Sequence, residues 1–137
     1  MPNNLFERFK IACRKNPADV LVEPKAVKDA REIYQLYTEK ELLKFIGNDG
    51  LKNVRHLNIT EWRNNPDKKN NPLDVYDYHC KTNGIPYYIA IIFIPTFFGK
   101  TINKWKLKSF HLPDDANLPM FDQLAKLSHS PLEDNDE

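Results

Sequence analysis

The sequence predicts an α+β fold in which N-terminal helices pack on an antiparallel β-meander. Before Gly50, apolar residues recur at three- and four-residue spacing, as on the buried side of a helix. After Gly50, short runs rich in β-branched and aromatic residues alternate with turn residues. A chain of 137 residues can bury one sizeable core. We therefore expect one domain over 1–127, with helices in 1–50, a sheet in 51–112 and a short helix over 118–127.

Three helices are expected in the N-terminal part. Asn3 or Asn4 can cap the first, which ends at Asn16-Pro17. Pro24 suits the first position of a second helix over about 24–37, because its missing N–H would be unsatisfied there in any residue.

A capping box predicts the start of the third helix. Thr38 is followed by Glu41 three residues later, and in such a pair each side chain accepts a hydrogen bond from the other residue's backbone N–H. The helix is expected over 39–46, and Gly47 or Gly50 can end it.

Four strands are expected after the helices, each pairing with the next. They cover 54–59, 73–81, 85–94 and 104–112, with a mobile loop over 64–72 and a turn over 96–103. Asn83-Gly84 predicts a two-residue hairpin turn, because both central positions of that turn need positive φ.

The formal net charge of +1 hides an uneven distribution of charged residues. Residues 50–112 contain ten basic and four acidic side chains, whereas the segment after Leu112 contains seven acidic residues and one lysine. A positive sheet surface attracts polyanions, RNA foremost, although a solvated basic face without a partner fits the same count. We expect 128–137 to be a disordered acidic tail.

Several classes of protein do not fit this sequence. The longest apolar stretch is interrupted by Pro86 and Pro95 and is shorter than the roughly 20 residues that a membrane-spanning helix needs. The N-terminus carries charges where a signal peptide needs an apolar run, so we expect a cytoplasmic protein. Cys13 and Cys80 lie on different predicted elements without a set of neighbouring ligands, and we expect no metal and no cofactor.

The last strand contains the most informative side chains. Lys104, Lys106 and Lys108 alternate along it, which places three ammonium groups about 7 Å apart, near the spacing of successive phosphates on a nucleic acid. His111 ends the strand, and histidine is the usual residue for proton transfer near neutrality. Simple alternation puts His111 on the opposite face from the lysines, so a bulge or a strand-end twist is needed to bring them together. An edge strand protected from aggregation by lysines fits the same pattern.

Short motifs in the strand region resemble one known family. Asp74-Val75-Tyr76, a turn at Gly84, Tyr87 at the head of an apolar strand and Ser109-Phe110-His111 at the end of the last strand resemble the MqsR group of RelE-like toxins. The similarity covers about residues 73–112. It implies a small bacterial endoribonuclease of a toxin–antitoxin system that cuts mRNA without a metal and has an antitoxin-like protein partner.

The resemblance also implies roles for individual residues. The catalytic tyrosine of the group falls on Tyr87. The group has a functional glutamine where this chain has Leu73, and a catalytic lysine where this chain has His111.

The chemistry of RNA cleavage defines which side chains we expect to act. Attack by the ribose 2′-hydroxyl needs a base that takes its proton and an acid that protonates the leaving 5′-oxygen. It also needs a positively charged group that stabilises the phosphorane. We predict that Tyr87, His111 and Lys108 are catalytic. The predicted nucleic-acid-binding residues are Lys104, Lys106, Arg55 and Arg63.

Two other functions fit the same sequence. A non-enzymatic interaction or effector domain would use the basic sheet to bind an acidic protein or RNA surface without cutting it. A small-molecule-binding domain would line a cavity with aromatic strand residues. Those residues are Tyr76, Tyr78, Tyr87, Tyr88 and Trp105.

Overall fold

The structure is a computed structural model of the chain, and it describes residues 2–113. The elements are α1 (Pro2–Lys15), a 3-10 helix η1 (Pro17–Asp19), β1 (Val20–Val22), α2 (Pro24–Tyr34), α3 (Glu39–Gly47), β2 (Arg55–Glu61), β3 (Asp74–Thr82), β4 (Ile85–Phe97) and β5 (Lys100–His111). The α+β fold is confirmed. The helix expected over 118–127 and the acidic tail over 128–137 lie outside the described residues.

The strands of residues 2–113 form one mixed sheet in the order β1-β5-β4-β3-β2. β2 to β5 pair as antiparallel neighbours, as expected for a meander. β1, which we did not predict, pairs in parallel with Trp105–Leu107 of β5. The expectation of a purely antiparallel sheet is therefore wrong at this side. β5 is also not an edge strand where β1 covers it, so its lysines do not protect an open edge there.

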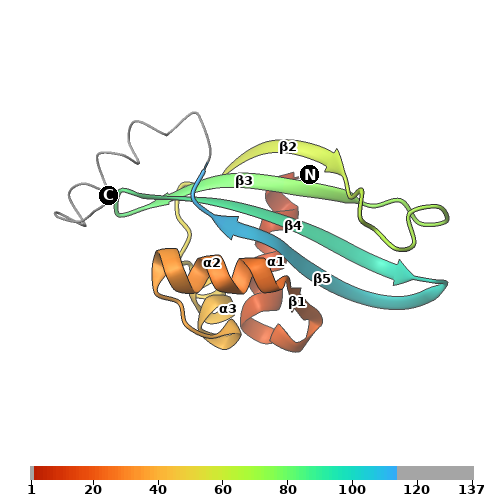
Figure 1. Ribbon diagram of the computed structural model, residues 1–137, viewed down its shortest axis with the longest axis horizontal. Coiled ribbons are helices and arrows are strands. Elements are labelled where there is room, and N and C mark those ends of the chain that lie inside the picture. Colours follow the sequence, from red (N-terminus) through yellow and green to blue (C-terminus); the bar gives the residue numbers. More distant parts are fainter. Residues whose placement is uncertain (1, 114–137) are drawn as a thin grey trace.

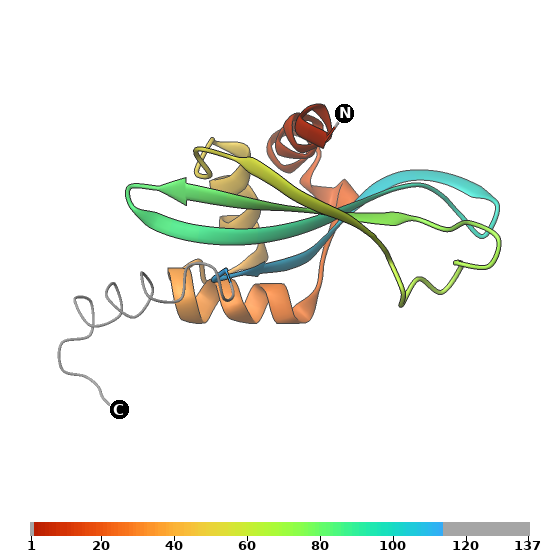
Figure 2. The ribbon, with the colours of Figure 1, turned by 90° about the horizontal axis from the view of Figure 1, so that it is seen from above.

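Within residues 2–113, the helices pack against one face of the sheet and none of them covers the other face. Figure 1 shows α2 and α3 below the strands, and Figure 2 views the sheet from above. The core on the helix side combines α1, α2 and α3 with strand residues such as Tyr78, Ile89, Leu107 and Phe110. A smaller cluster around Trp62 and Ile92 lies on the other side, which we call the open face.

Both hairpins turn through two residues with positive φ. Asn83 and Gly84 have φ of 53° and 80°, and β3 and β4 meet at Thr82 and Ile85, so the predicted turn is confirmed. β4 and β5 are joined by Phe98-Gly99, with φ of 50° and 82°. The longer turn expected over 96–103 is wrong, because both strands continue to the tip.

The segment between β2 and β3 is hydrogen-bonded to the β4–β5 hairpin, although its polar composition predicts a mobile loop. The Asn71 side chain donates to the carbonyl of Thr96 at 2.6 Å, and Asp67 Oδ2 accepts the N–H of Phe98 at 2.8 Å. Asp67 and Asn65 are buried. These polar side chains satisfy backbone groups of the hairpin, so the loop is anchored to it.

The predicted capping box forms at the start of α3. Thr38 Oγ1 accepts the N–H of Glu41 at 3.0 Å, and Glu41 Oε1 accepts the N–H of Thr38 at 3.2 Å. We expect Thr38→Ala to lower the free energy of unfolding by about 1 kcal/mol, measured by urea denaturation. Thr38→Ser keeps the accepting oxygen and is the control. Equal losses in both variants would contradict the prediction.

Candidate functional site on the open face

A β-bulge in β5 changes which side chains share a face. β4 and β5 pair as Ala90 with Ser109, and next as Ile91 with Leu107. Lys108 is therefore an extra residue on β5 with no counterpart on β4. Such an extra residue reverses the alternation of the side chains on its two sides.

The bulge places the lysines of β5 on the same face as His111. Lys106 pairs with Ile92 and His111 pairs with Tyr88. Ile92 and Tyr88 are four residues apart on β4, so both lie on the open face. Simple alternation would separate Lys106 from His111, and the bulge is one of the two irregularities that the sequence required to bring them together.

The side chains around the bulge line an open groove of about 610 Å³. β5 contributes Lys106, Lys108, Ser109 and His111, and the segment after β2 contributes Trp62. The start of α2 forms the far side of the groove. Three of the predicted site residues, Lys106, Lys108 and His111, thus meet in one groove.

A second hollow of about 430 Å³ adjoins the groove at the bulge. It shares Lys108 and Ser109 with the groove and adds Arg63 and Tyr88. Within residues 2–113, neither Lys108 nor Arg63 has an ion-pair partner. These two cations are therefore available to an anionic group bound at the bulge.

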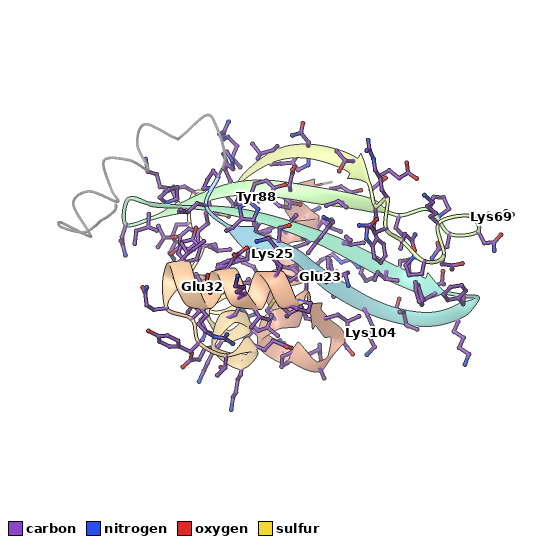
Figure 3. All side chains as sticks on the ribbon, in the orientation of Figure 1. Glu23, Lys25, Glu32, Lys69, Tyr88 and Lys104 are labelled. Carbon is purple, nitrogen blue, oxygen red and sulfur yellow. The ribbon has the colours of Figure 1, made fainter. Side chains whose placement is uncertain are left out.

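Two of the other lysines of β5 are ion-paired with residues that flank β1. Lys104 Nζ lies 3.0 Å from Asp19, and Lys106 Nζ lies 2.8 Å from Glu23. Figure 3 shows Glu23 beside β5 and Lys104 farther toward the hairpin tip. The free row of three ammonium groups expected from the sequence is thus partly neutralised.

His111 is held in a defined orientation by its neighbours. Its ring stacks on Tyr88, with centroids 4.8 Å apart and planes at 23°. Nδ1 donates to the carbonyl of Leu112 at 2.6 Å, so in the neutral ring Nε2 is the proton-accepting nitrogen. The hydroxyl of Tyr88 donates to Asp77 Oδ2 at 2.6 Å, which fixes the tyrosine ring.

A second histidine extends this row across the sheet. The register pairs Arg55 with His79, His79 with Tyr88 and Tyr88 with His111. Arg55 Nη2 is 3.4 Å from His79 Nδ1, and burial followed by the Arg55 charge lowers the pKa of His79. The sequence motifs indicated no role for His79 and no catalytic role for Tyr88. The pairing of His79 with Tyr88 could have been predicted from Asn83-Gly84, because a two-residue turn at this position sets His79 opposite Tyr88.

The structure places Tyr87 away from His111. Tyr87 lies on the helix side of β4, is 5% exposed, and packs on Tyr34 at a centroid distance of 4.4 Å. Burial raises the pKa of Tyr87. A hydroxyl in this core cannot reach a phosphate on the open face, so Tyr88 is the tyrosine beside His111.

The aromatic cavity expected for a small-molecule-binding domain is not formed by these side chains as a set. Tyr78, Tyr87 and Trp105 belong to the buried core that the helices share. Tyr88, in contrast, lines the hollow at the bulge.

No group of three or more His, Cys, Asp or Glu side chains among residues 2–113 could hold a metal ion. Burial raises the pKa of Cys13 and of Cys80 to about 12, so both remain thiols at neutral pH.

In the part of the chain that the structure describes, no helix is long and apolar enough to cross a membrane.

Comparisons of the chain with protein-family models, with curated proteins and with solved structures found no match. The resemblance of the strand motifs to the MqsR group therefore stays a prediction.

Proposed function

We propose that the open face of the sheet binds single-stranded RNA and cleaves it without a metal ion. The observation that supports this most is the bulge at Lys108, because it sets Lys108 and His111 on one groove. Cleavage of RNA by its own 2′-hydroxyl requires a positively charged group next to the phosphate and a proton acceptor next to the 2′-hydroxyl. Lys108 and Arg63 supply the charge, and His111 supplies the acceptor.

In the proposed reaction, the ribose 2′-oxygen attacks the adjacent phosphorus and the bond to the 5′-oxygen breaks. Nε2 of His111 accepts the 2′-hydroxyl proton, because Nδ1 is engaged by the Leu112 carbonyl. Lys108 and Arg63 stabilise the additional negative charge of the phosphorane. The Tyr88 hydroxyl donates one proton to the leaving 5′-oxygen once it turns from Asp77 Oδ2, to which it donates in the unbound protein. The products are a 2′,3′-cyclic phosphate and a 5′-hydroxyl.

One observation favours a second function, binding without cleavage. The hydroxyl proton of Tyr88 is directed at Asp77 and away from a leaving group. With that donor engaged, Lys108 and Arg63 would hold an RNA or an acidic protein surface while no proton transfer is completed.

The two functions are separated by one pair of measurements on the purified protein. Single-stranded RNA is incubated with the protein in EDTA, and binding of the same sequence with 2′-deoxyribose, which cannot be cleaved, is measured in parallel. We expect cleavage products with cyclic phosphate ends. Binding without products would favour the second function. Absence of both at micromolar concentrations of folded protein would contradict both.

The two adjacent tyrosines give a sharp prediction for the cleavage reaction. Tyr88→Phe removes the hydroxyl but keeps the ring that stacks on His111, and we expect the cleavage rate to fall about tenfold, as for loss of a hydrogen bond to a charged group. Tyr87→Phe removes a buried hydroxyl on the helix side and is the matched control, expected to change the rate less than twofold. A larger fall in the cleavage rate for Tyr87→Phe than for Tyr88→Phe would indicate that Tyr87 is the catalytic tyrosine.

A further inference from the structure

The β4–β5 hairpin has a bulky aromatic residue where its turn favours asparagine. Phe98 and Gly99 have φ of 50° and 82°, and Asn83 and Gly84 in the other hairpin have nearly the same values, 53° and 80°. Asn-Gly is a favoured pair in such turns, whereas a bulky side chain at positive φ is an outlier. Turn geometry therefore does not explain the phenylalanine at position 98.

Burial does not explain Phe98 either. Its side chain is 61% exposed, and its ring lies against Phe97 with centroids 4.7 Å apart. The backbone is nevertheless held firmly, because buried Asp67 accepts the Phe98 N–H at 2.8 Å. A strained and anchored turn that exposes an aromatic ring is typical of a contact residue.

The groove of the proposed RNA site extends toward this turn. Phe97 and Ile102 line the groove at one end and His111 lines it at the other. The ten residues from Ile102 to His111 span about 30 Å, at roughly 3.3 Å for each of the nine steps between them. Such a length accommodates about four to five nucleotides of an extended single strand.

Positive charge also gathers at the hairpin tip. Lys100 directly follows the turn and is exposed, and Lys69 is exposed on the loop that Asp67 anchors to the hairpin. Figure 3 shows Lys69 at the far end of the molecule, beside the tip of the hairpin. A strand leaving the groove at Phe97 would therefore meet both an aromatic ring and cations.

We propose that Phe98 stacks on a base of the bound RNA, about four to five nucleotides from the phosphate at His111. This inference rests on the proposed function and specifies its substrate as an unpaired segment of at least about five nucleotides. Stacking accepts every base, because every base has a π-face, so Phe98 confers a requirement for length and not for sequence. The same ring and cations would suit an anionic membrane, but the continuity of the groove with Phe97 favours RNA.

Phe98→Asn provides the test, because it removes the ring and restores the residue that the turn prefers. Binding is measured with uncleavable 2′-deoxy oligonucleotides of two to eight nucleotides. We expect Phe98→Asn to bind the longer ones about five- to tenfold more weakly than the native protein, and to bind di- and trinucleotides equally. Phe98→Trp, which keeps an aromatic ring, should retain the affinity for long oligonucleotides. Phe98→Asn should also melt at a higher temperature, because the strain at position 98 is relieved.

The outcomes separate this inference from the proposed function. Equal affinity of native and Phe98→Asn proteins at every length would overturn the role of Phe98 and leave RNA binding at the groove intact. A native protein that binds no RNA would overturn both. Loss of binding to vesicles containing phosphatidylserine, with RNA affinity unchanged, would assign Phe98 to a membrane contact and overturn the inference. A lower melting temperature of Phe98→Asn would contradict the argument from strain.

Discussion

Replacing His111 by alanine is expected to lower RNA cleavage at least tenfold, while the protein stays folded and still binds RNA. Removal of a general acid or base typically reduces the rate by about 10² to 10⁴. The lower bound allows for a water molecule that takes over the proton. Binding should persist, because Lys108 and Arg63 at the bulge are the proposed phosphate contacts and neither needs the imidazole.

The His111→Ala experiment measures cleavage in EDTA and affinity for uncleavable RNA on the same preparation. Lys108→Ala is the matched variant, because it removes charge from the same groove and should weaken both cleavage and binding. Full cleavage activity in His111→Ala would exclude the imidazole as the base. Loss of binding in His111→Ala, with cleavage per bound RNA unchanged, would assign the residue to RNA binding alone.

Replacing Phe110 by alanine is expected to lower the free energy of unfolding by about 3–5 kcal/mol. Phe110 is fully buried, and its ring meets Tyr34 edge-on at a centroid distance of 5.2 Å. The substitution leaves a cavity between α2 and the sheet. His111, the next residue, faces the other side, so His111→Ala should change the same free energy by less than about 1 kcal/mol.

Urea denaturation followed by circular dichroism measures both variants. A small domain has only about 5–15 kcal/mol of stability, so Phe110→Leu is included as a milder change that keeps the protein folded. We expect Phe110→Leu to lose less than Phe110→Ala. A loss below 1 kcal/mol in Phe110→Ala would show that this side of β5 is not the core.

Local signals in the sequence predicted those elements whose geometry depends on neighbouring residues. Thr38 and Glu41 fixed the start of α3, and Asn83-Gly84 fixed one hairpin. The end of α2 was expected at Tyr37, but Gln35 adopts a left-handed conformation at φ 57° and ends the helix at Tyr34. A glutamine does not predict this conformation, because glycine and occasionally asparagine or aspartate are the residues that usually adopt it.

The features that the sequence did not predict depend on contacts between distant segments. β1 has three residues, too few for a pattern of alternation, and forms because β5 lies beside it. The bulge at Lys108 exists only in the pairing of β4 with β5, and it decides that His111 and Lys106 share a face. Phe98-Gly99 does not resemble a turn by composition, so the turn of that hairpin was expected over 96–103 and is in fact only two residues long.

The sequence contained enough information to predict that Tyr88, and not Tyr87, lies on the same face as His79. The register set by the predicted turn opposes Cys80 to Tyr87 and His79 to Tyr88, so the two tyrosines must face different sides. The resemblance to the MqsR group pointed to Tyr87, whereas the hairpin register groups Tyr88 with the histidines.

The parallel pairing of β1 with β5 also constrains the order in which the chain can fold. β1 and its ion pair between Asp19 and Lys104 join residues 85 positions apart, whereas the β3–β4 and β4–β5 hairpins close through two residues. Closing a long loop costs more chain entropy than closing a hairpin, so the hairpins are expected to form before β1 docks. During synthesis the three helices emerge first, but the strand that completes their core, β5, emerges last among the described elements. The apolar faces of the helices therefore stay uncovered until nearly the whole domain has left the ribosome.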